Sequence, residues 1–341
     1  MCVHEMTGER DIRLDVAKGV GIIAVLIGHI VPWGCNTSRV IYAFHMPLFF
    51  VVSGMLAKRV SRADIGNEIG KVILNGIISY AFFLALSLTA FLLTEDGLRE
   101  LLSRRGFSSL FSSPWCNLSL WFLVVLTEVK VIYLLAGSFF DFRNRYLLVP
   151  LIVICTFLAM VSSYLWPGGR IVPGMLGAIP LCGLFYGIGL LVSEKVRRFS
   201  MSGIILYCLP CIALVVLLPA RIDFRYGVYP MWYLPLTMGL IFGVLALAGK
   251  ISKRNTGLSY VGRHSLYFFA MEVPVRTCLA GIFGLFGIRI PLYPWRENLS
   301  VSLMIFLLLS EVLILCVTVP VIKRIHSALQ ERFSRNFESD I

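Results

Sequence analysis

The sequence predicts an all-α integral membrane protein with about ten transmembrane helices and both termini in the cytoplasm. Of its 341 residues, 58% are hydrophobic and only 15% are charged, against about 25% charged in a typical soluble domain. Apolar runs of about 18 to 25 residues recur along the chain, the length that a helix needs to cross about 30 Å of hydrocarbon. With a mean hydropathy of +0.83, the composition excludes intrinsic disorder and an ordinary soluble protein.

The apolar runs divide residues 1–341 into ten predicted spans of a single membrane domain. Their approximate limits are 16–33, 40–57, 72–94, 118–138, 146–164, 174–193, 202–219, 230–249, 261–284 and 300–322. No small-residue cleavage site follows the first run, so we interpret it as a retained span rather than a signal peptide. The ninth run is the least regular, because Pro274 and Arg276 interrupt it.

Basic residues set the predicted orientation. With the N-terminus in the cytoplasm, eighteen of the 31 Lys and Arg residues fall in cytoplasmic segments and nine in outer loops. An excess of Lys and Arg marks the cytoplasmic side of a membrane protein, which also accounts for the net charge of +12. We therefore predict a multi-pass protein of a bacterial inner or plasma membrane, with the lipid bilayer and not nucleic acid as its partner.

The nine cysteines do not indicate a disulfide framework, since most of them lie in apolar runs as small hydrophobic residues. Cys208 and Cys211 form a C-x-x-C pair, but the second pair or the βαβ context of a zinc or redox motif is missing. We predict no metal site.

The first span carries a polar stripe. Lys18 and His29 are eleven residues apart, which at about 100° per residue returns to the same helix face about 16 Å further along. Ionisable groups inside a membrane are costly and are candidates for function. Lys18 could instead be a snorkelling lysine paired with Asp15, whereas an imidazole at this depth needs a partner.

The second span begins with a histidine at a matching depth. His45 lies in the segment Phe-His-Met-Pro-Leu-Phe-Phe at residues 44–50, on a helix that runs antiparallel to the first. We expect the His29 and His45 imidazoles to face each other. Histidine takes and returns a proton near neutral pH, so the pair is suited to general-base chemistry on a substrate hydroxyl.

Several motifs in order resemble the membrane acyltransferase type 3 family, and in particular its fucose 4-O-acetylase-like branch. They lie at residues 13–19, 28–29, 44–50 and 53–54, then at 120–123, 183–187, 223–227 and 258–266. Many family members have Arg-x10-His in the first span, where this chain has Lys18 and His29. Lysine keeps the charge but lacks the bidentate fork of a guanidinium. The resemblance also predicts a histidine at the position that Glu272 occupies.

The resemblance implies transfer of an acyl group, usually acetyl from acetyl-CoA, to a sugar hydroxyl of a cell-surface or lipid-linked glycan. No cofactor would be bound, since acetyl-CoA is a co-substrate. In this interpretation His29, helped by His45, is the base, although a covalent acyl-histidine relay remains open. Lys18, Arg13 and Asp15 would bind the donor at the cytoplasmic mouth. The acceptor-binding candidates are Trp121, Asp223, Arg225 and Tyr226. Trp121 could instead be an interface residue, and the other three could belong to a solvated loop.

Other charged residues within the spans have structural explanations. Glu128 and Lys130 could pair with neighbouring helices. Glu272 and Arg276 are four residues apart and could neutralise each other. Glu311 has no partner nearby in sequence, so it is either protonated or faces one of these cations.

Two other functions compete with the acyltransferase. A transporter of a glycan or lipid-linked sugar would also need a polar path through its helices. A non-catalytic subunit would act with glycan-assembly proteins. Two histidines at one depth beside a cytoplasmic cation favour the enzyme, because a transporter would place charges at several depths.

Overall fold

The computed structural model confirms the predicted all-helical class. It describes residues 11–57, 60–92, 116–139, 145–165, 177–192, 201–224, 228–252, 257–291, 294, 297 and 299–339. Within these ranges the only β pairing is an isolated antiparallel bridge between Asp223 and Val228.

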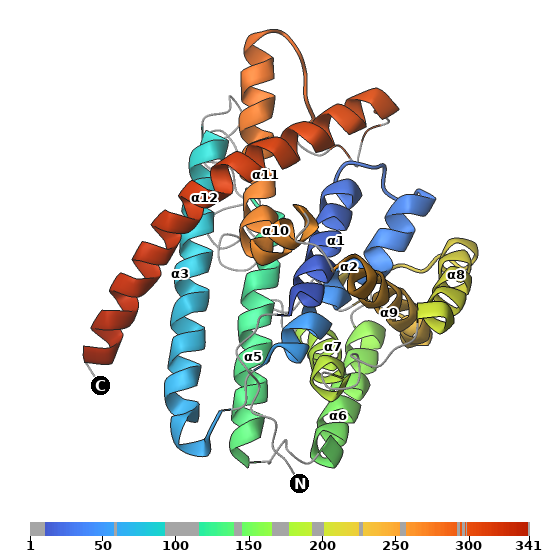
Figure 1. The fold of residues 1–341 in the computed structure, drawn as a ribbon, viewed down its shortest axis with the longest axis vertical. Coiled ribbons are helices and arrows are strands. Elements are labelled where there is room, and N and C mark those ends of the chain that lie inside the picture. Colours follow the sequence, from blue (N-terminus) through green and yellow to red (C-terminus); the bar gives the residue numbers. More distant parts are fainter. Residues whose placement is uncertain are drawn as a thin grey trace.

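A helix lies in each of the ten predicted segments (Figure 1). The α-helices are α1 (Ile12–Gly28), α2 (Asn36–Met55), α3 (Ile65–Leu92), α5 (Trp121–Phe139), α6 (Arg145–Leu165), α7 (Ile179–Val192), α8 (Met201–Leu217), α9 (Leu234–Ile251), α10 (Gly257–Arg263), α11 (Ser265–Leu285) and α12 (Val301–Ser339). Short 3-10 turns, η1 (Arg62–Asp64), η3 (Leu118–Leu120) and η7 (Met231–Tyr233), lead into α3, α5 and α9.

Six helical segments of the described chain are long and apolar enough to cross a membrane. They are Asn36–Met55, Arg62–Leu92, Leu118–Phe139, Met231–Ile251, Ser265–Leu285 and Val301–Arg335. Shorter apolar helices lie at Leu148–Val161, Ile179–Val192 and Leu206–Leu217. Helix α1 has 17 residues and carries charge in its first turns. These helices support a multi-pass membrane protein.

The outward side chains of α12 have the character of a lipid-facing surface. Leu309, Leu313, Val317 and Val321 recur every four residues, and each is between 58% and 68% exposed. Residues four apart share one face of a helix. An apolar stripe of this kind is expected where a helix meets hydrocarbon rather than water.

Several helix boundaries differ from the prediction; α3, for example, begins at Ile65 rather than at residue 72. Helix α1 ends at Gly28, and the chain then turns toward Pro32 instead of continuing to residue 33. The ninth segment is divided at His264, whose backbone (φ −108°, ψ 21°) is not helical. Helix α12 continues to Ser339, well past residue 322. The hydropathy pattern ends there because charged residues begin, but a helix can continue in water.

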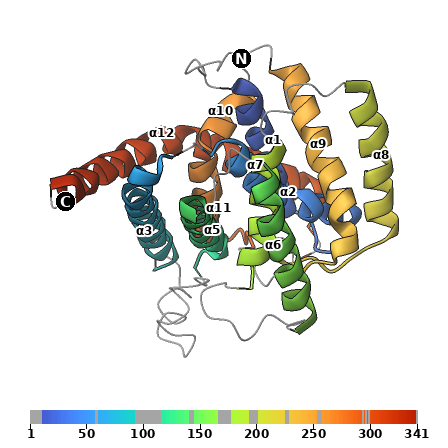
Figure 2. The same ribbon diagram turned by 90° about the horizontal axis from the view of Figure 1, so that it is seen from below.

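The helices do not form one parallel bundle. Helices α3 and α5 are seen lengthwise in Figure 1 and nearly end-on in Figure 2, whereas α8 and α9 are lengthwise in Figure 2. Helix α12 runs obliquely across α11 and α3 and packs against both. Helix α1 packs against α2, α9, α10 and α11, so it lies in the interior of the helical assembly.

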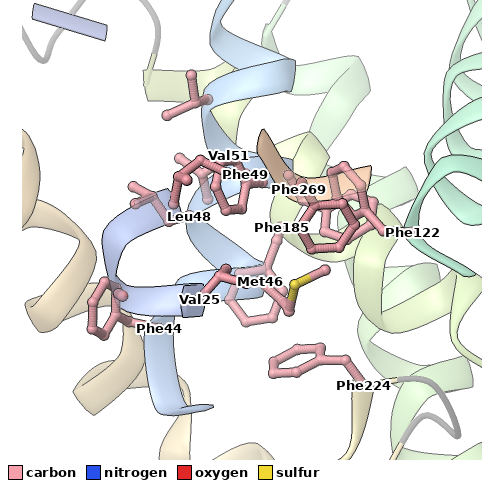
Figure 3. Close-up of a cluster of buried hydrophobic side chains, with 14 of the residues drawn as sticks. Val25, Phe44, Met46, Leu48, Phe49, Val51, Phe122, Phe185, Phe224 and Phe269 are labelled. Carbon is pink, nitrogen blue, oxygen red and sulfur yellow. The ribbon is translucent and has the colours of Figure 1, made fainter. Parts of the chain in front are cut away.

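An aromatic cluster joins α2, α5 and α11 (Figure 3). Phe122 lies at the centre, with its ring centroid 5.9 Å from that of Phe49, 5.1 Å from Phe50 and 5.3 Å from Phe269. The rings meet edge to face, the arrangement that their quadrupoles favour. This core holds α11 close to the α1–α2 pair.

Close backbone approach fixes α1 against α10. A Cβ atom added to Gly19 would meet the carbonyl oxygen of Leu258, and one added to Gly262 would meet that of Asp15. Only glycine allows two helix backbones to come this near. The contact holds α10 across the first half of α1 and places Arg263 beside Asp15.

Candidate active site

A buried network of four side chains joins α1, α11 and α12, and His29 is its first member. His29 caps the C-terminus of α1, and its backbone N–H donates to the carbonyl of Val25 at 3.0 Å. This anchors the residue while its ring turns toward α11. The His29 Nδ1 atom lies 2.9 Å from Oε1 and 2.8 Å from Oε2 of Glu272.

Arg276 links Glu272 to Glu311. Its Nη2 atom donates to Glu272 Oε1 at 2.6 Å, as four-residue spacing on α11 predicts. Its Nε and Nη2 atoms also donate to the Glu311 carboxylate on α12, at 2.5 and 3.0 Å. This bidentate pairing is one of the two alternatives that the sequence leaves open for Glu311. Arg276 Nη1 donates in addition to the His29 carbonyl at 3.5 Å.

The carboxylates and the guanidinium of the network are fully buried. Glu272 and Glu311 are 0% exposed and Arg276 is 1% exposed, whereas the His29 side chain keeps 20% exposure. With both carboxylates ionised, the three buried groups carry a formal charge of −1. A protonated His29 would neutralise it, and buried charges persist in proteins only when paired in this way. The His29 ring therefore faces a buried carboxylate that is itself held by Arg276.

His45 lies near this network on α2. It is 3% exposed, and its Nδ1 atom is 2.8 Å from the carbonyl oxygen of Ile41, to which a neutral ring would donate. That bond orients the ring and makes Nε2 the basic nitrogen. His45 lies within electrostatic range of both His29 and Glu272. The structure thus brings the two predicted histidines into one region.

The N-terminal half of α1 carries the predicted donor-binding residues. Lys18 Nζ lies 3.0 Å from the carboxylate of Asp15, which is buried. Arg13 pairs with Asp11 at 2.8 Å and remains partly exposed. Arg263, from α10, reaches the same Asp15 at 3.9 Å. Three cations therefore gather at one end of α1 against two carboxylates.

The structure describes two of the four predicted acceptor-binding residues. Trp121 is buried at the start of α5, with its ring edge-on to Phe122. Burial among protein side chains argues against a position at the lipid interface. Asp223 forms the backbone bridge with Val228. Arg225 and Tyr226 lie outside the described residues.

The remaining intramembrane pair lies on α5. Glu128 Oε2 is buried and has no hydrogen-bond partner among the described residues, while Lys130 lies within electrostatic range of Glu68 on α3. Lys130 therefore faces a neighbouring helix, as one of the sequence interpretations expects.

Sequence reasoning did not anticipate the contact between His29 and Glu272, nor the position of Arg263 beside Asp15. One signal was present, because Glu272 and Arg276 stand in an otherwise apolar segment. The residues that contact each other are 243 positions apart, and no local pattern connects them.

Comparison with known proteins identifies the family. Residues 11–322 match the profile of the Acyl_transf_3 family, described as an acyltransferase domain. The chain belongs to this family. This confirms the broad family that the motifs indicate, a family of acyltransferase domains.

Two named relatives are similar over short segments. The nodulation protein NolL of Sinorhizobium fredii is 35% identical over 92 residues, which cover 24% of this chain and 25% of that protein. NolL of Mesorhizobium japonicum is 39% identical over 61 residues, covering 15% of this chain and 16% of that protein. The matched segments thus span a quarter or less of these relatives. No solved structure matches the chain.

The network predicts a specific pattern of stability. Arg276→Met should lower the stability of the detergent-solubilised protein by about 3–5 kcal/mol, because it leaves two buried carboxylates without their cation. Adding Glu311→Gln to this variant should recover part of the loss, since one stranded charge is removed. Thermal unfolding of the wild type, both single variants and the double variant measures the effect. Additive losses in the double variant would contradict the pairing.

Proposed function

We propose that this acyltransferase moves an acetyl group from acetyl-CoA to a hydroxyl of a sugar in a cell-surface or lipid-linked glycan, with His29 as general base. The contact of His29 with the buried Glu272 carboxylate is the observation that carries this proposal. Nucleophile activation by a base requires a base that is itself oriented by a third group. Glu272, fixed in turn by Arg276, supplies that orientation.

The reaction needs little from the protein besides proton transfer and charge stabilisation. His29 takes the proton of the sugar hydroxyl as its oxygen attacks the thioester carbonyl. Because Glu272 occupies the Nδ1 side, the proton would be taken at Nε2. The C–S bond then breaks, an ester C–O bond remains, and the leaving CoA thiolate takes the proton from the imidazolium. The formal negative charge of the network stabilises that imidazolium while it exists.

His45 has a supporting role in this mechanism. Its proximity to His29 and Glu272 would let its unprotonated Nε2 atom accept a hydrogen bond from the reacting hydroxyl. Direct transfer needs no covalent intermediate on the protein. A relay through an acyl-histidine would instead leave the acetyl group on the enzyme before the acceptor binds.

The cations at the inner end of α1 support the choice of donor. CoA is a polyanion. Lys18 and Arg263 share the Asp15 carboxylate, and Arg13 pairs with Asp11 at the start of the same helix; the side chains of Arg13 and Arg263 keep exposed surface. Arginine forks suit phosphate and lysine acts as a point charge. Asp15 would hold Lys18 and Arg263 in position for the donor. Acetyl-CoA would then enter from the end of α1 opposite to His29.

The proposed donor site agrees with the predicted membrane topology. We propose ten spans with both termini in the cytoplasm of a bacterial inner membrane, supported by the biased distribution of Lys and Arg. Cytoplasmic acetyl-CoA would then meet the basic end of α1. Reporter fusions after Lys58 and Arg145 should give cytoplasmic signals, and a fusion after Arg105 an external one. A cytoplasmic signal at Arg105 would overturn this orientation.

The base assignment predicts the loss of glycan acetylation. His29→Ala should reduce transfer by about 10²- to 10⁴-fold, the usual contribution of a positioned general base. Glu272→Gln, which keeps a hydrogen-bonding group but removes the charge, should retain more activity than His29→Ala. Acetyl esters per sugar repeat, measured at matched protein levels, test both variants. A wild-type ratio in the His29→Ala strain would exclude this role, and less surface glycan with normal acetylation would indicate a transporter.

The donor assignment predicts an effect on acetyl-CoA alone. Lys18→Ala should raise the KM for acetyl-CoA and leave kcat nearly unchanged, whereas Lys18→Arg should retain transfer because it keeps the charge. Transfer from labelled acetyl-CoA in membrane vesicles measures both constants. If Lys18→Ala behaves as wild type at limiting acetyl-CoA, Lys18 only neutralises Asp15.

A further inference from the structure

We propose that Trp33 and Tyr42 form an acceptor-binding platform at the edge of the region that holds His45 and His29, where a sugar of the acceptor glycan stacks on the exposed indole of Trp33. This inference rests on the proposed function and adds the part of the site that receives the acceptor. Neither residue belongs to the motifs that suggested an acceptor site. Trp33 lies in the α1–α2 connection, and Tyr42 lies on α2 with its ring against His45.

Two aromatic rings, those of Trp33 and Tyr42, lie between the surface and the buried His45. The indole of Trp33 is stacked on the Tyr42 ring, with centroids 5.8 Å apart and planes at 10°. Tyr42 in turn meets His45 edge-on, with centroids 5.0 Å apart and planes at 87°. The outermost ring is 59% exposed and the innermost residue is 3% exposed. A molecule resting on Trp33 is thus two ring contacts away from His45.

The connection between α1 and α2 keeps the platform close to His29. The Tyr42 hydroxyl donates to the carbonyl of Gly28 at 3.5 Å, which ties α2 to the residue immediately before His29. Gly34 has a φ of +83°, a conformation that other residues adopt only with strain. It allows the chain to turn directly after Trp33 and enter α2. The connecting loop therefore holds the indole of Trp33 against Tyr42. Only residues 30–33 separate His29 from Gly34, where the loop turns.

The surroundings of the indole suit a sugar. The face of a pyranose ring carries several C–H groups that pack on an aromatic face, while its hydroxyls need polar neighbours at the edge. Asn36 and Thr37 follow in the next residues and are exposed. An aromatic surface with a few polar groups around it is the usual composition of a small-molecule site. The 20% exposure of the His29 side chain leaves that ring accessible to a bound hydroxyl.

Trp232 provides an internal comparison. It precedes α9, is 56% exposed, and packs edge-on against Tyr233 with centroids 5.0 Å apart. Its exposure is therefore nearly that of Trp33. Tryptophans in such positions commonly anchor a helix at the membrane interface. Tyr233 donates to the Val215 carbonyl, so this pair joins α9 to α8, and no ring contact between Trp232 and a histidine is found among the described residues.

The experiment compares these two tryptophans in the acyl-transfer reaction. Membrane vesicles containing the wild type, Trp33→Ala, Trp33→Phe or Trp232→Ala receive labelled acetyl-CoA and glycolipid extracted from a strain that lacks this gene. Acceptor and donor are varied separately. Trp33→Ala should raise the KM for the extracted acceptor about tenfold, with kcat and the KM for acetyl-CoA unchanged. Trp33→Phe should keep most of the affinity, and Trp232→Ala should match the wild type.

Three other outcomes would contradict the acceptor-binding platform. An unchanged acceptor KM in Trp33→Ala would show that the indole does not touch the sugar. Equal increases for Trp33→Ala and Trp232→Ala would show that both are interface anchors. Loss of transfer by the wild type itself would overturn the proposed function and the platform with it, whereas a normal wild type with an unaffected Trp33→Ala would overturn the platform alone.

Discussion

The pairing of Arg276 with Glu272 and Glu311 is the interaction on which the site depends. A guanidinium withdrawn from solvent needs compensating charge, and each buried carboxylate needs the same in return. The three groups come from two helices, and the contact with His29 adds a third. Removing Arg276 would leave two buried carboxylates without the cation that both of them contact. The geometry of α1, α11 and α12 is therefore tied to an electrostatic requirement as well as to packing.

This constraint has a consequence for His29. The residue lies just beyond the end of α1, where a side chain could ordinarily adopt several orientations. Its ring is held instead by both oxygens of Glu272, and its carbonyl is held by Arg276. The aromatic core around Phe122 keeps α11 at the correct distance. A rigid support for a reactive group on a helix terminus is the arrangement that catalysis requires, because small displacements of a base reduce its efficiency strongly.

The two ends of α1 differ in chemistry. The end that begins the helix carries cations and the buried Asp15, and α10 is held against it through Gly19 and Gly262. The end that finishes the helix carries His29 and leads into the loop with Trp33. One helix therefore connects a basic region to an imidazole about 16 Å away along its axis, by the rise of an α-helix. Under the proposed function, donor and acceptor approach His29 from opposite ends of α1.

The sequence by itself determined the helical class and the positions of the helical segments, and it singled out Lys18, His29 and His45 as candidate site residues. These depend on local composition and spacing, which hydropathy and helix periodicity express directly. It could not determine that Glu272 contacts His29, that Glu311 pairs with Arg276, or that α10 and α11 separate at His264. Those facts arise from contacts between residues far apart in the chain, where the need to neutralise buried charges and to pack helices selects the partner. Only the tertiary structure decided them, because no local pattern records which distant charge will be nearest.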